Sequence, residues 1–159
     1  MADVFAGSEI VEICVEIERN GYTFYESVAA KLSDPAVVEL AHWLGDQEKE
    51  HERIFVAMLE GLRKADTWDS YEGEYALYMK ALSQSHVFKG AGAATTLVQK
   101  ITSDMDMLDA AAWFEKDTIL FLHEMKPAVP AAEQPVIERL INEERGHLRK
   151  INELRERLV

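Results

Sequence analysis

The sequence is poor in the residues that mark several common classes of protein. It has 1 cysteine in 159 residues, Cys14, which excludes an internal disulfide framework and a metal site built from several thiolates of this chain. Basic residues are also few, with 17 Lys and Arg against 29 Asp and Glu and a net charge of -12. We therefore expect no nucleic acid and no membrane surface as a partner, because both favour a basic protein face.

Long apolar runs are missing as well. No segment approaches the ~20 apolar residues of a membrane-spanning helix. The first residues, MADVFAGSEI, lack the basic and apolar regions of a secretory signal peptide. We therefore expect a cytoplasmic protein and, at this length, one domain over residues 1–159 around a single core.

Proline is scarce too, and its placement predicts long helices. The 4 prolines leave positions 36–126 free of this helix breaker. Apolar residues recur at spacings of three and four, which predicts four long helices over 8–32, 35–62, 103–125 and from 131–135 almost to the end. They form two helical hairpins, 8–62 and 103–158, joined by a crossover over 63–102 in which 70–83 is expected to be a short extra helix. A crossover of about 40 residues can run the length of the helices, so we predict an all-α four-helix bundle with one long crossover.

Charged residues interrupt the apolar faces of the predicted helices. In the second helix the apolar series is broken by Glu48 and His51, and in the last helix by Glu144 and His147. Both pairs have the spacing Glu-x-x-His, and residues three apart lie on one helix face. Each pair can therefore contact a single ion.

The other two long helices each carry one carboxylate on the apolar face, Glu18 and Glu115. An ionised carboxylate is very costly to bury without a partner, and four of them facing one interior repel one another. Two divalent cations would balance their charge, with the two histidines as neutral ligands. The alternative is a surface network of ion pairs on four amphipathic helices.

A second Glu-x-x-His pair in the same helix serves as an internal control. Glu39 and His42 precede Glu48 and His51 by nine positions, which is about half a turn away around the helix axis. The control pair should therefore face the opposite side of the helix. Both pairs have the spacing of a metal-binding motif, but only Glu48 and His51 lie on the helix face that is predicted to point into the bundle.

An internal repeat supports the same six residues. Glu18 and Glu115 lie 97 positions apart, and Glu48 and His51 lie 96 positions before Glu144 and His147. The control pair has no copy at this spacing. The two hairpins are therefore predicted to bring two equivalent half-sites together at a centre for two metal ions.

This arrangement resembles the ferritin-like di-iron carboxylate superfamily, and within it the rubrerythrin-like branch. In that superfamily two helices supply one Glu each and the other two supply Glu-x-x-His. The segments IERNGYTFYESVA around Glu18 and FEKDTILFLHEM around Glu115 are similar to that branch as well. The resemblance covers residues 8–63 and 103–158 and implies a ferritin-like bundle with a di-iron site.

The resemblance has two departures. Full-length rubrerythrins carry a rubredoxin-like domain with four iron-binding cysteines, and the single Cys14 predicts that this domain is absent here. Rubrerythrins usually also have a further Glu three residues after the ligand in the third long helix, where this chain has Thr118. That extra ligand is linked in the family to metal movement between redox states.

We expect two iron ions per chain, with manganese or zinc as alternatives. The predicted ligands are Glu18, Glu48, His51, Glu115, Glu144 and His147. Glu48 and Glu144, related by the repeat, are expected to bridge the ions, while the assignment of each histidine to an ion stays open. The four glutamates are also the candidate catalytic residues. Tyr25 joins them either as a hydrogen-bond donor to a ligand or an electron relay, or else it is a core tyrosine with a satisfied hydroxyl.

Three functions fit this site. The first is an oxidoreductase, a peroxidase or oxidase that reduces hydrogen peroxide or dioxygen with electrons from a separate donor protein such as a rubredoxin. The second is a ferroxidase that handles iron, which predicts a large cage-like oligomer. The third is a non-catalytic bundle stabilised by metal. The long crossover is unlike a compact cage subunit and favours a homodimer, so we rank the three in this order.

Overall fold

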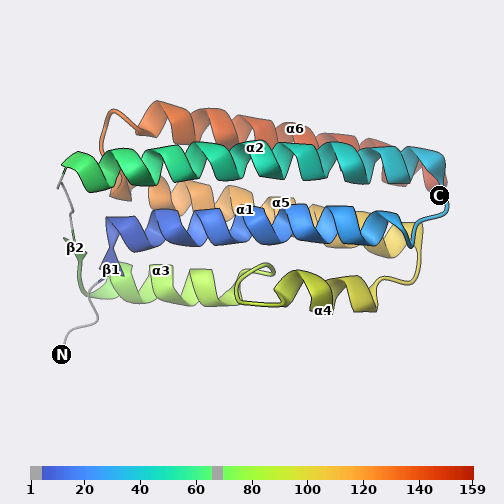
Figure 1. The fold of residues 1–159 in the computed structure, drawn as a ribbon, viewed down its shortest axis with the longest axis horizontal. Coiled ribbons are helices and arrows are strands. Elements are labelled where there is room, and N and C mark those ends of the chain that lie inside the picture. Colours follow the sequence, from blue (N-terminus) through green and yellow to red (C-terminus); the bar gives the residue numbers. More distant parts are fainter. Residues whose placement is uncertain (1–4, 66–69) are drawn as a thin grey trace.

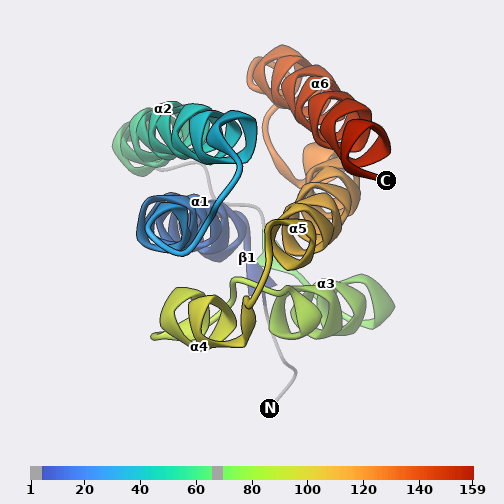
Figure 2. The same ribbon diagram turned by 90° about the vertical axis from the view of Figure 1, so that its right-hand side faces the viewer.

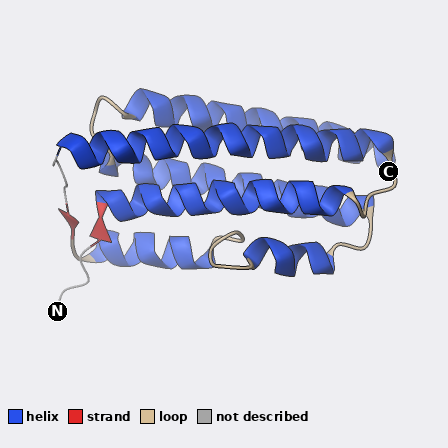
Figure 3. Cartoon of the chain, viewed as in Figure 1, coloured by secondary structure: helices blue, strands red, loops and turns tan. Residues whose placement is uncertain are grey.

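The computed structural model describes residues 5–65 and 70–159, and four long antiparallel helices dominate it. They pair into the two predicted hairpins, which lie side by side (Figures 1 and 2): α1 (Gly7–Ala29) with α2 (Pro35–Ala65), and α5 (Asp104–Met125) with α6 (Gln134–Leu158). Helices account for most of the described chain (Figure 3). The predicted all-α four-helix bundle is therefore confirmed.

Side-chain caps define the starts of two of the long helices, α2 and α5. The Asp34 carboxylate accepts a hydrogen bond from the backbone N–H of Ala36 at 2.8 Å, directly before α2 begins at Pro35. The Ser103 hydroxyl accepts from the N–H of Asp106 at 3.1 Å at the start of α5. Both residue types satisfy N–H groups that the first helical turn leaves free.

The C-terminal ends of both helices in the first hairpin differ from the predicted positions by about one helical turn. Helix α1 stops at Ala29 and not at Leu32, because the next N–H groups bond carbonyls three residues back, as in Lys31 N–H to Val28 O at 2.9 Å. Helix α2 continues beyond Leu62 to Ala65. Terminal turns often tighten or fray in this way, so apolar spacing locates helix ends poorly.

The crossover contains two helices where one was expected. Helix α3 covers Glu74–Ser85, later than the predicted 70–83, and α4 covers Ala93–Lys100, which was expected to be a connector. Gly90 and Gly92, with φ of 101° and 78°, make the turn between them. Residues 66–69 of the crossover lie outside the described residues. The strand β2 (Ser70–Tyr71) pairs antiparallel with β1 (Phe5–Ala6).

The two crossover helices form a third layer beneath α1 and α5, as Figure 2 shows. The side-chain amide of Asn20 on α1 donates to the carbonyl of Phe88 at 2.7 Å, and Lys31 donates to the carbonyl of Val98 at 2.7 Å. This layer shields one side of the bundle from solvent. Phe88 is therefore fully buried, and its ring packs on that of Phe114 in α5, with ring centroids 4.5 Å apart.

The core runs along the middle of the bundle and consists mainly of aliphatic and phenylalanine side chains. Among the described residues, no helix has the combined length and apolarity to cross a membrane. Burial of this apolar surface is the main stabilising contribution to such a fold. The exceptions inside the core are a few charged and polar side chains, and most of them belong to one cluster.

Candidate metal centre

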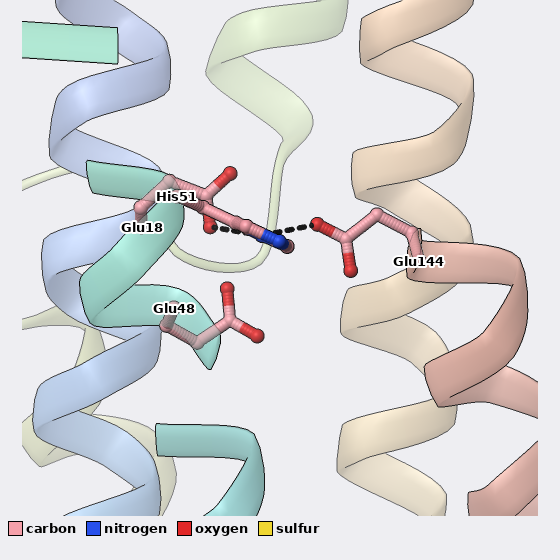
Figure 4. Close-up of side chains that lie close together, drawn as sticks. All are labelled: Glu18, Glu48, His51 and Glu144. Atoms are coloured by element: carbon pink, nitrogen blue, oxygen red, sulfur yellow. Dashed lines mark ion pairs between the residues drawn. The ribbon is translucent and has the colours of Figure 1, made fainter. Parts of the chain in front are cut away.

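Six charged or ionisable side chains from all four long helices meet inside the bundle. Each is at most 3% exposed, and they are Glu18, Glu48, His51, Glu115, Glu144 and His147. These are the six residues predicted as metal ligands. Figure 4 shows four of them, with Glu144 reaching from α6 toward His51 on α2.

The six residues form two overlapping groups. One group contains Glu18 and His51, the other contains Glu115 and His147, and both share Glu48 and Glu144. Within each group, one possible ligand atom per residue lies within 4.8 Å of the others. This grouping fits two neighbouring cation positions with the two shared carboxylates between them.

Eight buried side-chain oxygen and nitrogen atoms in the described residues have no hydrogen-bond partner, and all eight belong to this cluster. They include both carboxylate oxygens of Glu48 and of Glu144, and Nδ1 of both histidines. The Glu144 oxygens lie within ion-pair distance of the two Nδ1 atoms, but not in hydrogen-bond geometry. Leaving buried polar atoms unpaired is costly, and proteins rarely do so. Carboxylate and imidazole atoms without partners are the donor set that divalent transition metals require, so the residues fit a metal centre.

Burial and mutual repulsion raise the pKa values of three of the carboxyl groups. Burial raises the pKa of Glu18 to about 7 and that of Glu115 to about 8, and the charge of Glu144 adds to both shifts. Burial, together with the neighbouring Glu18, raises the pKa of Glu48 well above 4.5. These raised pKa values favour the protonated form of all three groups in the absence of a cation.

Glu144 is the exception, because both histidines lie against it. His51 Nδ1 is 2.9 Å from one of its oxygens, and His147 Nδ1 is 2.7 Å from the other. Burial opposes the shift, but the two imidazolium charges outweigh it and lower the pKa of Glu144. Burial likewise opposes protonation of the histidines, but the carboxylates raise the pKa of His147 to about 9 and that of His51 well above 6.5.

The two histidines differ in what lies behind them. His51 Nε2 is 3.0 Å from the carboxylate of Glu143, which also lies 3.5 Å from Arg139. His147 instead packs edge-on against Trp43, with ring centroids 5.1 Å apart. Sequence reasoning missed Glu143, although a carboxylate directly before the Glu144 motif was an available signal. Such a partner orients a ligating imidazole and fixes its tautomer.

Tyr25 reaches across the bundle to the other hairpin. Its hydroxyl donates to Oε1 of Glu115 at 3.2 Å, and its side chain is fully buried. Burial and the charge of Glu115 raise the pKa of the Tyr25 hydroxyl, so it stays protonated as a donor. The hydrogen bond to a predicted ligand is therefore present, and that ligand is Glu115 of the other hairpin.

Thr118, at the position of the extra family glutamate, pairs with a histidine from the crossover. His86 is buried, and its Nε2 lies 3.3 Å from the Thr118 hydroxyl. The backbone N–H of Phe88 donates to Nδ1 of His86 at 3.2 Å, so Nε2 carries the proton of the neutral ring. Burial lowers the pKa of His86 from 6.5 to about 4. The sequence analysis did not foresee this pair, because it depends on how the crossover packs.

The control pair lies on the outside of α2, as its phase predicted. The side chain of His42 is 53% exposed and pairs with Glu26 at 3.0 Å, and Glu39 is exposed.

Glycines near the cluster differ in their surroundings. A Cβ added at Gly21 would lie 2.9 Å from the Phe114 ring, whereas one at Gly146 would meet nothing within 4 Å. Close helix packing therefore explains Gly21 and not Gly146.

Comparison with known proteins agrees with this geometry. A solved structure from Thermotoga maritima, described as a ferritin-like diiron-carboxylate protein, matches with a TM-score of 0.77 over 98% of this chain and 97% of its own, at 22% sequence identity. This match supports the fold. A search of curated proteins found no significant match. The sequence model of the rubrerythrin family matches residues 9–155, so the chain belongs to the rubrerythrin family.

Proposed function

We propose that this chain is a di-iron redox protein that reduces hydrogen peroxide or dioxygen with electrons from a separate donor protein. The observation that carries the proposal is the buried cluster, in which eight atoms of six side chains have no hydrogen-bond partner. Its division into two four-residue groups with two shared carboxylates fits a pair of ions better than a single ion. Membership of the rubrerythrin family supports iron as the metal.

The grouping also suggests how the ligands are divided. Glu18 and His51 would hold one ion, Glu115 and His147 would hold the other, and Glu48 and Glu144 would bridge them. Two bound iron ions supply the two electrons that one peroxide or dioxygen molecule takes up, by passing between the ferrous and ferric states. Four carboxylates allow the site to accommodate both charge states.

The surrounding residues position the ligands and handle protons. The Tyr25 hydroxyl holds its proton against Glu115 at 3.2 Å, where it limits rotation of that carboxylate. On the other side, Glu143 receives the outer N–H of His51, and its side chain is 40% exposed. Reduction of peroxide to two waters consumes two protons, and Glu143 is the cluster's contact with solvent through which we infer they enter.

The first experiment measures iron bound after anaerobic loading with ferrous iron. The variant Glu48→Ala, His51→Ala removes one Glu-x-x-His pair, and Glu39→Ala, His42→Ala removes the outward-facing pair of the same helix. We expect about two irons per chain in the wild type and in the second variant, and a sharp loss in the first. Circular dichroism on both variants checks that they are folded.

Equal iron binding in the two variants would contradict the di-iron proposal. If iron binds as expected, stopped-flow mixing of the reduced protein with peroxide or with dioxygen ranks the oxidants. Repeated turnover with a supplied reductant is expected of the redox enzyme. A ferroxidase would instead accumulate oxidised iron in a large assembly, and a structural metal would leave the iron spectrum unchanged. The homodimer and the cytoplasmic location stay predictions that sedimentation and cell fractionation would test.

A further inference from the structure

A basic groove lies between α5 and α6 on this otherwise acidic protein. Its volume is about 340 Å³, and four cations line it, Lys116, Arg145, Arg149 and Arg155. No carboxylate is among its lining residues, although the chain has a net charge of -12. Such a concentration of one sign creates a local field that attracts anionic partners.

Two of these four cations, Lys116 and Arg145, form no ion pair with a carboxylate in the described part of the chain. Arg155 is neutralised by Asp109 at 2.7 Å, and Arg149 lies 3.9 Å from Glu153. Arg145 bonds only neutral groups in the described part of the chain, the side chains of Asn142 at 2.8 Å and His123 at 3.2 Å.

Large apolar side chains extend the groove along α5. Trp113 is 64% exposed and Leu120 is 45% exposed, and the ammonium group of Lys116 lies 5.3 Å from the centre of the Trp113 ring. These three residues are spaced by three and four, so they share one face of the helix. Exposed tryptophan is enriched at protein interfaces, as arginine is, whereas a site for a small anion needs no such apolar border.

The groove lies directly outside the second half of the candidate metal centre. Lys116 follows Glu115 in the chain, Arg145 follows Glu144, and the lining residue Leu148 follows His147. Neighbouring residues are only about 3.8 Å apart along the backbone. A carrier bound in this groove would therefore be close to the ligands of one ion, where electron transfer needs it to be.

We propose that this groove, bordered by Trp113 and Leu120, docks an acidic electron-carrier protein that delivers electrons to the Glu115–His147 half of the centre. The inference rests on the proposed function, which requires an external donor. Two reduced carriers give one electron each, and one peroxide takes up the two electrons and two protons to form two waters. Charge complementarity of this kind mainly raises the rate of association.

The test uses iron-loaded protein, reduced rubredoxin as the acidic carrier and peroxide as the oxidant. The double variant Lys116→Glu, Arg149→Glu reverses two charges in the groove. The control is the double variant Arg53→Glu, Lys64→Glu, which makes the same change in net charge on α2, away from the groove. We expect the first variant to lower the second-order rate constant of rubredoxin oxidation at least tenfold at low salt, and the second to change it less than threefold. The neutral variant Lys116→Gln, Arg149→Gln should fall between them.

Binding is measured separately, as the dissociation constant of fluorescently labelled rubredoxin for the same iron-loaded proteins. A tenfold weakening of binding confined to the groove variants supports the docking site. A failure of the iron-loaded wild type to consume peroxide with a small-molecule reductant would reject the proposed function, and it would leave this binding result unaffected. Equal weakening by both charge reversals overturns the docking site. The docking site is also overturned if the wild type is a dimer that dissociates when the groove charges are reversed. It is likewise overturned if the groove binds pyrophosphate tightly and the protein does not bind rubredoxin.

Discussion

The two helical hairpins supply the same side-chain types to the buried cluster, yet the residues around these side chains differ. Glu143, behind His51, corresponds by the 96-residue repeat to Gln47, for which the structure shows no bond to His147. Trp43, which packs on His147, corresponds in the same way to Arg139. The repeat therefore accounts for the six buried residues, while the surrounding side chains make the two half-sites chemically unequal.

The two shared glutamates also differ from each other. Glu144 lies within ion-pair distance of both histidines, whereas the structure shows no ion pair between Glu48 and either histidine. Related positions in the repeat therefore have pKa values shifted in opposite directions in the metal-free protein. The two histidines lower the pKa of Glu144 against the effect of burial, whereas burial and Glu18 raise the pKa of Glu48 well above 4.5.

The largest effect we expect comes from replacing these two glutamates one at a time. Glu144→Gln removes the partner of two buried imidazolium groups and should destabilise the metal-free protein by about 3 kcal/mol. Glu48→Gln replaces a carboxyl group whose pKa is raised well above 4.5 and whose oxygens have no hydrogen-bond partner, so it should change stability by less than about 1 kcal/mol. Urea unfolding of both metal-free variants at pH 7 measures the difference. Equal losses would mean that the two carboxyl groups are equivalent after all.

A second difference concerns Thr118, whose counterpart in the first hairpin, 97 positions earlier, is Gly21. Only the second hairpin therefore has a hydroxyl for the buried His86, whose pKa is lowered to about 4 by burial. Below pH 6.5 the unfolded chain binds a proton at this residue that the folded protein does not, so folding stability falls as pH falls. Between pH 7 and pH 5 we expect His86 to account for a loss of about 2 kcal/mol.

The measurement compares urea unfolding of metal-free wild type and His86→Gln at both pH values. The variant should lose about 2 kcal/mol less than the wild type on acidification, whatever its stability at pH 7. His42→Gln is the matched control, because His42 is exposed, and it should follow the wild type. A pH dependence unchanged by His86→Gln would show that this ring becomes protonated in the folded state.

The smallest effect tests the partners behind the two histidines. Glu143→Gln removes the carboxylate at His51 and should weaken binding of one ferrous ion about tenfold. Gln47→Glu places a carboxylate at the related position in the first hairpin and should strengthen binding of the other ion if it reaches His147. Competition with a metal-binding dye resolves the two affinities. Parallel weakening of both ions by Glu143→Gln would mean that the two half-sites bind metal as one unit.

The ligand cluster was predictable because helix geometry relates sequence spacing to direction. A pair such as Glu48 and His51 must share a face, and the control pair nine positions earlier must face away. Helix α4 was missed because it is short. Its eight residues place Ala94, Leu97 and Val98 against the core, but a segment of this length is not stable as an isolated helix, and its packing on α1 stabilises it.

The sequence by itself determined the all-α bundle, its two hairpins and the six residues that converge in its interior, because these follow from local periodicity and from a repeat. Only the tertiary structure decided that Tyr25 bonds Glu115, that Glu143 supports His51 and that His86 bonds Thr118. Each of these contacts joins helices whose relative rotation depends on the packing of the whole core. Spacing along one chain carries no information about that rotation, which is why the unequal surroundings of two similar half-sites emerge only in three dimensions.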